Sequence, residues 1–288
     1  MALLLPAGSR NCKKNICSIQ QFLPKRPSSS KRWQARQLKD HFTREAAVQG
    51  LKSRAAFKLL QIDEKHHLFQ SGQTVVDLGY APGSWSQVAL ARTQPRGRVL
   101  GVDIIPSQPP KGVSTIQGNF LDLEVQAYVR EFVRNPRRGR HYSQEAIQDV
   151  DDAEGSVESA LEASSTSGTL RNKNVGHGYS DAQRTVDVVL SDMMMNTSGL
   201  PFKDHAGSMD LCRAALEFSY EVLNAGGHFV CKFYQGTEDK DLEKQLRALF
   251  QKVHRLKPES SRSESKEAYF IGLKRRPDAK KQEVLTPP

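Results

Sequence analysis

A glycine-containing loop behind an apolar run is the first place where the sequence indicates chemistry. TVVDLG (74–79) is typical of a short buried strand, and APGSWS follows it directly. Gly79 and Gly83 permit close approach of the backbone to a ligand. Ligands of open α/β sheets bind at the carboxyl ends of strands. The G-x-G-x-x-G fingerprint is absent, which disfavours a nicotinamide dinucleotide.

A carboxylate ends the second apolar run, GRVLGVDII (97–105). Asp103 at that place can accept hydrogen bonds from the two hydroxyls of a ribose. With the preceding loop, this predicts an adenosyl ligand without a pyrophosphate, namely S-adenosylmethionine. The alternative is that the glycines only make a tight connection between a strand and a helix.

A lysine interrupts the apolar run GHFVCKFYQG. With a period of two residues, Lys232 shares a strand face with Val230 and Tyr234. A lysine inside a central strand is costly unless it is paired or lies at the strand end. The alternative is an edge-strand lysine whose stem lies along apolar surface.

Three further charges could join Lys232 at one edge of the sheet: Lys58, Asp192 and Glu267. A ribose hydroxyl is a weak acid, so its proton must be taken as it attacks. A neighbouring lysine favours the neutral amine that can act as the base, and carboxylates orient it. Taken singly, Lys58 and Glu267 are equally compatible with solvated surface charges.

Asp192 is followed by three methionines, Met193 to Met195, in the stretch LSDMMMNTSG. The aspartate stands at the end of a β-branched run, where a ligand would bind. The methionines are expected at the rim of that site, because flexible thioethers repack readily around a ligand.

The elements that must position these residues alternate along the chain. Residues 40–69 have helical periodicity. Strands are expected at 74–79, 97–105, 113–120, 186–193, 226–234 and 267–274, with VHRLKP beside the last, and helices at 84–92, 121–133, 209–223 and 241–250. This alternation predicts a mostly parallel, doubly wound α/β sheet.

Composition separates this domain, residues 40–274, from segments of other character. Residues 134–183 are polar and are expected to be a disordered insertion, and 275–288 a disordered tail. Residues 1–39 hold nine Lys or Arg and no acid, which predicts a mitochondrial transit peptide or, alternatively, a basic disordered arm that binds RNA.

Charge and cysteine content restrict the partners. Without residues 1–39 and the acidic stretch 141–170, the chain carries a net charge of +8. That favours a nucleic-acid partner over a merely soluble basic surface. The four cysteines lack zinc-ligand spacing and fit a reducing compartment, so no metal is expected. No apolar run is long enough for a transmembrane helix.

Taken together, these segments resemble the FtsJ-type RNA 2′-O-ribose methyltransferases. The resemblance covers residues 40–274 apart from the insertion, and it rests on SRAAFKLLQIDEK, VVDLGYAPGSWSQVA, LGVDIIP, IQGNF, LSDM with NTSG, GGHFVCKFYQG and KPESSRSESKEAYFIG. It implies a Rossmann-like class I methyltransferase fold, with a mostly parallel seven-stranded sheet and helices on both faces. It also implies a catalytic tetrad of Lys58, Asp192, Lys232 and Glu267. The implied cofactor-binding residues are Gly79, Ala81, Pro82, Gly83, Ser84, Trp85, Asp103, Asn119 and Asp192.

The resemblance further implies S-adenosylmethionine-dependent methylation of an RNA ribose. Combined with a transit peptide, it implies a uridine of mitochondrial large-subunit ribosomal RNA, a matrix location and a role in ribosome biogenesis. The alternatives are an RNA-binding assembly factor in which methylation is dispensable, and a transfer-RNA methyltransferase. Four basic residues are expected to hold RNA phosphates: Arg54, Lys203, Arg262 and Lys274.

The sequence departs from the family pattern at several positions. Tyr80 replaces the usual Ala, and Ser84 the usual Gly or Ala. Asn119 stands where an Asp is common, and its side-chain oxygen can still accept a bond from an adenine amino group. Met194 and Met195 replace an Ala-Pro pair, which affects the shape of that loop.

Overall fold

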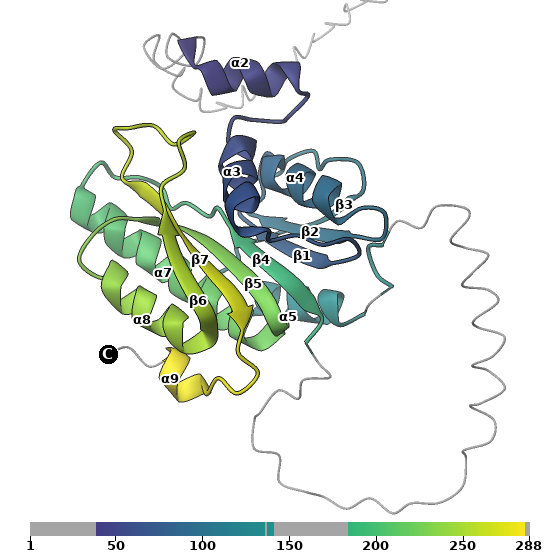
Figure 1. Ribbon diagram of the computed structural model, residues 1–288, viewed down its shortest axis with the longest axis vertical. Helices are drawn as coiled ribbons and strands as arrows, with labels where there is room; N and C mark the ends of the chain where they lie inside the picture. Colours follow the sequence, from purple (N-terminus) through teal and green to yellow (C-terminus); the bar gives the residue numbers. More distant parts are fainter. Residues whose placement is uncertain (1–38, 136, 141–183, 286–288) are drawn as a thin grey trace, which may run out of the picture. The chain divides into compact units, whose positions relative to one another are not determined.

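A seven-stranded sheet organises residues 39–135, 137–140 and 184–285, which the computed structural model describes. Across the sheet the strands follow the order β3-β2-β1-β4-β5-β7-β6 (Figure 1). Their bounds are β1 Thr74–Leu78, β2 Arg98–Asp103, β3 Val113–Gln117, β4 Val186–Ser191, β5 Leu223–Tyr234, β6 Phe250–Leu256 and β7 Glu267–Arg275. The predicted α/β class with a mostly parallel sheet is therefore confirmed.

One strand of the sheet is reversed. β1 pairs in parallel with β2 and β4, β2 with β3, and β4 with β5. β7 runs antiparallel to its neighbours β5 and β6. The strand order changes direction beside β1, because β2 and β3 lie on one side of it and β4 on the other. The crevice at such a reversal is where open α/β sheets bind ligands.

Helices cover both faces of the sheet (Figure 1). One face is covered by α3 (Ala56–His66) and α4 (Ser84–Thr93). A further helix, α2 (His41–Val48), precedes α3 in the chain. The other face is covered by α5 (Leu123–Arg134), α7 (Pro201–Val222), α8 (Asp239–Leu249) and α9 (Lys281–Leu285). Sheet strands covered on both faces read as continuous apolar runs, which explains the sequence pattern.

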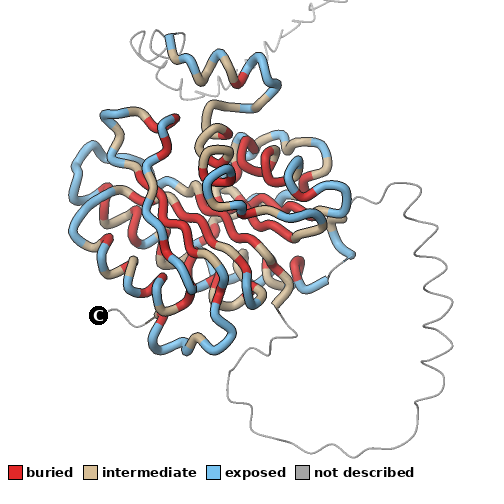
Figure 2. Tube along the Cα trace, in the orientation of Figure 1, coloured by how far each residue is buried: buried red, intermediate tan, exposed pale blue. Residues whose placement is uncertain are grey.

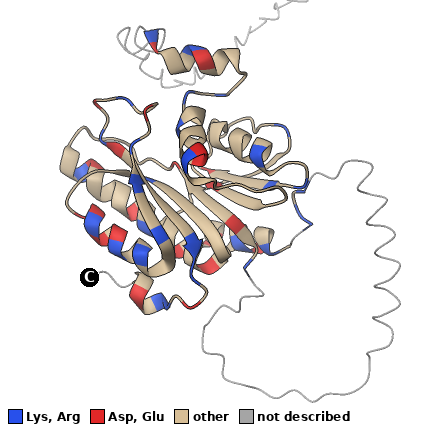
Figure 3. Cartoon of the chain, in the orientation of Figure 1, with Lys and Arg blue, Asp and Glu red and all other residues tan. Residues whose placement is uncertain are grey.

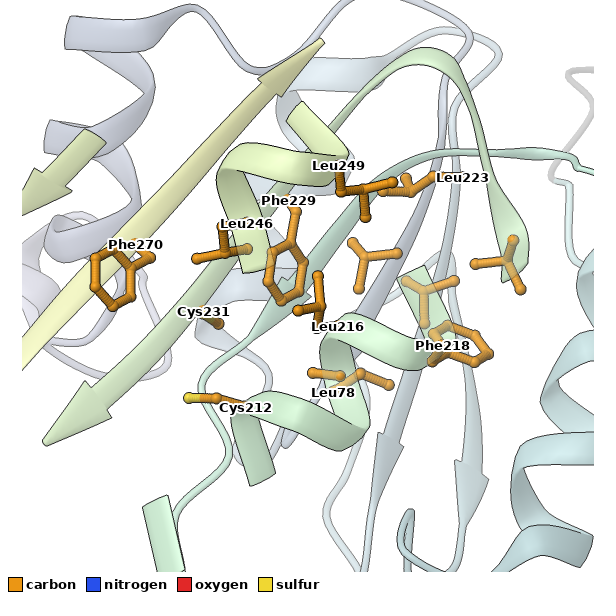
Figure 4. Close-up of a cluster of buried hydrophobic side chains, with 14 of the residues drawn as sticks. Leu78, Cys212, Leu216, Phe218, Leu223, Phe229, Cys231, Leu246, Leu249 and Phe270 are labelled. Atoms are coloured by element: carbon orange, nitrogen blue, oxygen red, sulfur yellow. The ribbon is translucent and has the colours of Figure 1, made fainter. Parts of the chain in front are cut away.

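The core is formed where the strands meet these helices. Figure 2 shows the central strands as buried and the outer sides of the helices as exposed. Figure 4 shows Leu216 of α7 and Leu246 of α8 beside Phe229 of β5. Cys212 and Cys231 are buried free thiols in the same cluster. In Figure 3 the central strands are mostly free of charged residues, whereas the helices and loops carry many.

Three elements differ from the sequence-based expectation. The region 40–69 forms two helices, because a turn with Gly50 at φ 67° ends α2. α7 begins eight residues before the predicted 209, with Pro201 in its first turn and Asp204 bonded to the preceding loop. The tail expected to be disordered includes α9, whose Val284 is fully buried. The predicted transit peptide lies outside the described residues except for Lys39, and so does the predicted insertion 134–183 except for residues 134, 135 and 137–140.

Candidate active site

A pocket of about 270 Å³ opens at the carboxyl ends of β1, β2 and β4, at the reversal of strand order. Five of the predicted cofactor-binding residues line it: Gly79, Ala81, Asp103, Asn119 and Asp192. Lys232 from β5 lines it as well. The fold therefore brings together residues that are more than 150 positions apart in the sequence.

Backbone groups hold the Asp103 carboxylate at the end of β2. One oxygen accepts from the Ala81 N–H at 2.9 Å and the other from the Ile105 N–H at 2.8 Å. Each carboxylate oxygen can accept a further bond. Asp103 thus ties the two loops at the pocket mouth together and can still accept hydrogen bonds from a diol.

Part of the pocket wall is apolar. Ile104, Ile105 and Leu121 line it and are exposed. Exposed apolar groups that gather in one pocket are typical of a ligand site. Asn119 stands beside them, with its Oδ1 accepting from the Leu121 N–H and its Nδ2 donating to Asp122. Sequence reasoning missed the three apolar residues, although their places just after the strands indicated them.

Lys232 and Asp192 form an ion pair in the pocket wall. The Lys232 Nζ lies 3.1 Å from Asp192 Oδ1 and donates to the backbone oxygen of Asp192 at 2.7 Å. The Lys232 side chain is only 8% exposed. A buried ammonium requires such a partner, so Asp192 holds the lysine at one position.

Lys58 and Glu267 form a second pair, with Nζ and Oε1 2.6 Å apart. Burial raises the pKa of Glu267, but the charge and hydrogen bond of Lys58 and the charge of Lys232 outweigh it, so this pKa lies below the usual carboxyl value. The four predicted catalytic residues are therefore arranged as two ion pairs.

Tyr269 connects the two pairs, and it was not among the predicted site residues. Its hydroxyl donates to Asp192 Oδ1 at 3.2 Å, and its ring lies 5.9 Å from Lys58 Nζ. In the β5–β7 register it stands directly opposite Lys232. Its spacing of two residues from Glu267 on one strand was the signal that could have identified it.

Asp77, below the pocket on β1, is a buried carboxyl group. Burial raises its pKa to about 7, and the charges of Asp192 and Asp103 act in the same direction, against a hydrogen bond from Ser86. The Ser86 hydroxyl lies 2.6 Å from Asp77 Oδ2. The carboxylates of Asp192 and Asp103 therefore act on a carboxyl group, Asp77, that is largely protonated below neutral pH.

The other four predicted cofactor residues, Pro82, Gly83, Ser84 and Trp85, do not line this pocket. Trp85 is buried, donates from Nε1 to the Ala55 carbonyl and packs against Tyr269. The Ser84 hydroxyl lies 2.6 Å from that of Ser53. Both side chains join the loop to the start of α3, so the structure gives them positions that support the pocket.

Tyr80 fills space that a glycine leaves on β2. Its ring is buried, and a Cβ added at Gly101 would lie 2.6 Å from it. Its hydroxyl donates to the Ser107 carbonyl at 2.8 Å. Tyr80, where the sequence departs from the family pattern, therefore connects the loop after β1 to the loop after β2.

The three methionines have different surroundings. Met193 lines the pocket and packs on the core. Met194 is exposed, lines the pocket and lies 3.5 Å from the Tyr234 hydroxyl. Met195 lies against Gly207 of α7. The expected position at the rim therefore fits Met194 best.

The four expected phosphate-binding residues are spread over the fold. Arg54 and Arg262 both pair with Asp40, and Arg54 also donates to the Ser260 carbonyl. Lys203 is exposed in the first turn of α7. Lys274 lies at the other end of β7 from Glu267, seven residues or roughly 23 Å away. That distance separates Lys274 from the site.

The arrangement combines a diol acceptor, an apolar wall and a lysine held by a carboxylate. These groups can bind a nucleoside and remove a proton from a hydroxyl beside it. Among the described residues no group of three His, Cys, Asp or Glu could hold a metal ion. No helix in the described ranges is long and apolar enough to cross a membrane.

Comparison with known proteins agrees with this chemistry. The family model for FtsJ-like methyltransferases matches residues 51–275. The mitochondrial rRNA methyltransferase 2 of Saccharomyces cerevisiae is 38% identical, over 90% of this chain and 92% of its own length. Its namesake in Schizosaccharomyces pombe is 34% identical over 85% of this chain and 96% of its own.

Bacterial proteins and a solved structure extend the comparison. Ribosomal RNA large subunit methyltransferase E of Nitrosospira multiformis is 35% identical over 88% of this chain and 99% of its own. A crystal structure described as a ribosomal RNA methyltransferase from Plasmodium falciparum superposes with a TM-score of 0.51 at 24% identity. It covers 78% of this chain and 98% of that one, and it supports the fold.

Proposed function

Because the chain belongs to the FtsJ-like methyltransferase family, we propose that it transfers a methyl group from S-adenosylmethionine to a ribose 2′-hydroxyl of ribosomal RNA. The observation that carries the proposal is the ion pair of Lys232 and Asp192 in the wall of the pocket. A lysine held beside a nucleoside-sized pocket is suited to take a hydroxyl proton.

The pocket fits this cofactor on its chemistry. Asp103 can accept from the ribose hydroxyls, and the apolar side chains Ile104, Ile105 and Leu121 can cover the adenine ring. Asn119 Oδ1 can accept from the adenine amino group in addition to its bond from Leu121. When bound, S-adenosylmethionine supplies an electrophilic methyl group. The finer fold assignment, a Rossmann-like class I methyltransferase, is part of this proposal.

Lys232 is the general base in the proposed mechanism. It accepts the 2′-hydroxyl proton. Bound S-adenosylmethionine would supply the methyl group that the hydroxyl oxygen takes, with the sulfur–methyl bond breaking and S-adenosylhomocysteine leaving. Asp192 orients the Lys232 Nζ through the 3.1 Å contact and then stabilises the ammonium that forms. Positioning of the hydroxyl in line with the methyl group supplies a large part of the rate acceleration.

Lys58 and Glu267 complete the site from α3 and β7. The Lys58 side chain can orient the target hydroxyl. Glu267 holds Lys58 in place through the 2.6 Å pair. The exposed Lys203 and the Asp40-bound arginines Arg54 and Arg262 are proposed to contact RNA phosphates.

The names of the relatives support a more specific RNA substrate and a cellular compartment for this protein. Two are mitochondrial rRNA methyltransferases and the bacterial relative acts on the large subunit, as their names state. We therefore propose a uridine of mitochondrial large-subunit ribosomal RNA, methylated in the matrix during ribosome biogenesis. The basic stretch 1–39 fits a transit peptide.

Mapping ribose methylation across mitochondrial ribosomal RNA, with and without this protein, tests the proposal. We expect one 2′-O-methyluridine of the large-subunit RNA to disappear without the protein. Reintroducing the wild-type chain is expected to restore this 2′-O-methyluridine. Reintroducing a Lys232→Ala chain is not expected to restore it. An unchanged methylation map would contradict the proposed function.

A further inference from the structure

A second pocket lies beside the first, and the proposed mechanism does not use it. It has a volume of about 310 Å³ and lies between the loop before α7, the end of β5 and the segment before β7. Its lining includes Thr197, Asp204, Tyr234, Gln235, Ser265 and Lys266. Its size falls at the lower end of small-molecule sites, which are roughly 300–1,000 Å³.

Tyr234 joins this second pocket to the catalytic residues. It is two residues after Lys232 on β5, so their side chains share one face of the strand. In the register of β5 and β7 it stands opposite Glu267. Its hydroxyl lies 3.5 Å from Sδ of Met194, which lines the first pocket. A group in the second pocket would therefore be next to the reacting ribose.

Hydrogen bonds hold the walls of the second pocket in place. Asp204 accepts from the Ser198 N–H at 2.7 Å and from the Gly199 N–H at 3.1 Å, which fixes the loop before α7. On the other side, Lys257 donates to the carbonyls of Ser263 and Ser265 at 3.0 and 2.7 Å. The pocket is thus largely formed before any ligand enters.

Two side chains of the pocket, Gln235 and Lys266, can donate hydrogen bonds to a ligand. Arg255 donates to Gln235 Oε1 at 3.0 Å and is itself paired with Asp239. This bond uses one of the two acceptor positions of the Gln235 amide oxygen, and Gln235 Nε2 can donate. Lys266 is exposed and forms no ion pair within the described part of the chain. Uracil presents carbonyl acceptors, whereas cytosine and adenine present an amino donor on the corresponding edge.

Exposed apolar residues where this loop enters α7 point to a single-stranded ligand. Leu200 and Phe202 flank the lining residue Pro201, and Phe202 is 78% exposed. Proteins that bind single-stranded RNA stack bases on aromatic side chains and read the exposed base edges by hydrogen bonds.

We propose that the second pocket binds the base of the target nucleotide, with Tyr234 as the stacking surface and Gln235 as the group that selects uracil. The proposal rests on the proposed function and adds a substrate-specificity site to it. The ribose then lies between the two pockets, with its 2′-hydroxyl toward Lys232.

Equilibrium binding of short oligouridine and oligocytidine of equal length to the full chain tests the proposal without requiring catalysis. We expect the wild type to bind oligouridine at least about fivefold more tightly, because a good base contact discriminates by about that much or more. Gln235→Ala is expected to bring that ratio close to one. Tyr234→Ala is expected to weaken binding of both RNAs roughly 5- to 150-fold, the range for loss of base stacking.

Two further variants separate recognition from folding. Tyr234→Phe keeps the ring and is expected to bind like the wild type. Gln251→Ala changes an exposed glutamine at the end of β6 that lies away from the pocket. It is expected to leave the affinity for both RNAs unchanged. Equal binding of the two RNAs by the wild type, or an unchanged ratio in Gln235→Ala, would overturn the proposal. A failure of the proposed function would appear separately, as absent methyl transfer by the wild type.

Discussion

Tyr269 donates its hydroxyl to Oδ1 of Asp192 at 3.2 Å, and the same oxygen lies 3.1 Å from Lys232 Nζ. Two donors therefore fix one carboxylate oxygen at the end of β4. Because Tyr269 is fully buried, this bond is shielded from water.

Removing that hydroxyl should disturb the site without unfolding the protein. For Tyr269→Phe we expect kcat to fall about tenfold, because a hydrogen bond to a charged group contributes roughly 1.5–3 kcal/mol. Thermal unfolding should stay close to the wild type, since the ring still packs on Trp85. Steady-state kinetics with unchanged kcat would remove Tyr269 from the positioning role.

Asp77 should make stability depend on pH. Its folded-state pKa of about 7 exceeds the ordinary 3.8, so between these values the folded chain binds a proton that the unfolded chain has lost. Wild-type stability should then fall by roughly 1.4 kcal/mol per pH unit across that window through this group. The stability of Asp77→Asn should lack this pH dependence. The variant should therefore become more stable relative to the wild type as pH rises. Denaturant titrations without cofactor at pH 5 to 8 that give parallel curves would contradict the assignment.

Lys58 and Glu267 should be energetically coupled. In a double-mutant cycle of Lys58→Ala and Glu267→Gln, the double variant should lose less stability than the two single variants combined, by about 0.5–3 kcal/mol. Because the Glu267 pKa is depressed, the coupling should be fully present above the ordinary value of 4.5 and should disappear as pH falls through the lower pKa of Glu267 in the folded state. Additive effects at neutral pH would show that the 2.6 Å pair contributes nothing.

Asp103 should control cofactor affinity. For Asp103→Ala we expect the Kd for S-adenosylmethionine to rise about 10- to 100-fold, because the diol acceptor and the anchors of two loops are lost. Asp210→Ala is the matched control, since that carboxylate is 71% exposed on α7. Calorimetric titration that gives equal Kd values for both variants would exclude Asp103 from the cofactor site.

The sequence predicted the sheet and its ligand-binding edge because both depend on local patterns. Apolar runs that end in Asp103 or Asp192 marked strand ends, and parallel strands present those ends at one edge. The direction of a loop side chain depends instead on distant partners. Trp85 shows this, because the Ala55 carbonyl and the Tyr269 ring that hold it come from other elements.

Tertiary contacts also explain the elements that were mispredicted. The first turns of α7 carry few periodic apolar residues and look like a loop until Asp204 is seen to bind Ser198 and Gly199. α9 is short and polar, yet Val284 is buried against α8. The pairing of each lysine with a particular carboxylate likewise depends on how α3, β4, β5 and β7 pack together, which composition does not specify.

The role of Lys232 as general base is the central claim, and Lys232→Ala tests it most directly. Methyl transfer to RNA and binding of S-adenosylmethionine are measured on the same preparation, with Lys244→Ala on the surface of α8 as the control. We expect transfer to fall at least about 100-fold, the lower bound for loss of a general base. The cofactor Kd should stay close to the wild-type value, and the control should match the wild type. Methyl transfer by Lys232→Ala at the wild-type rate would contradict the account.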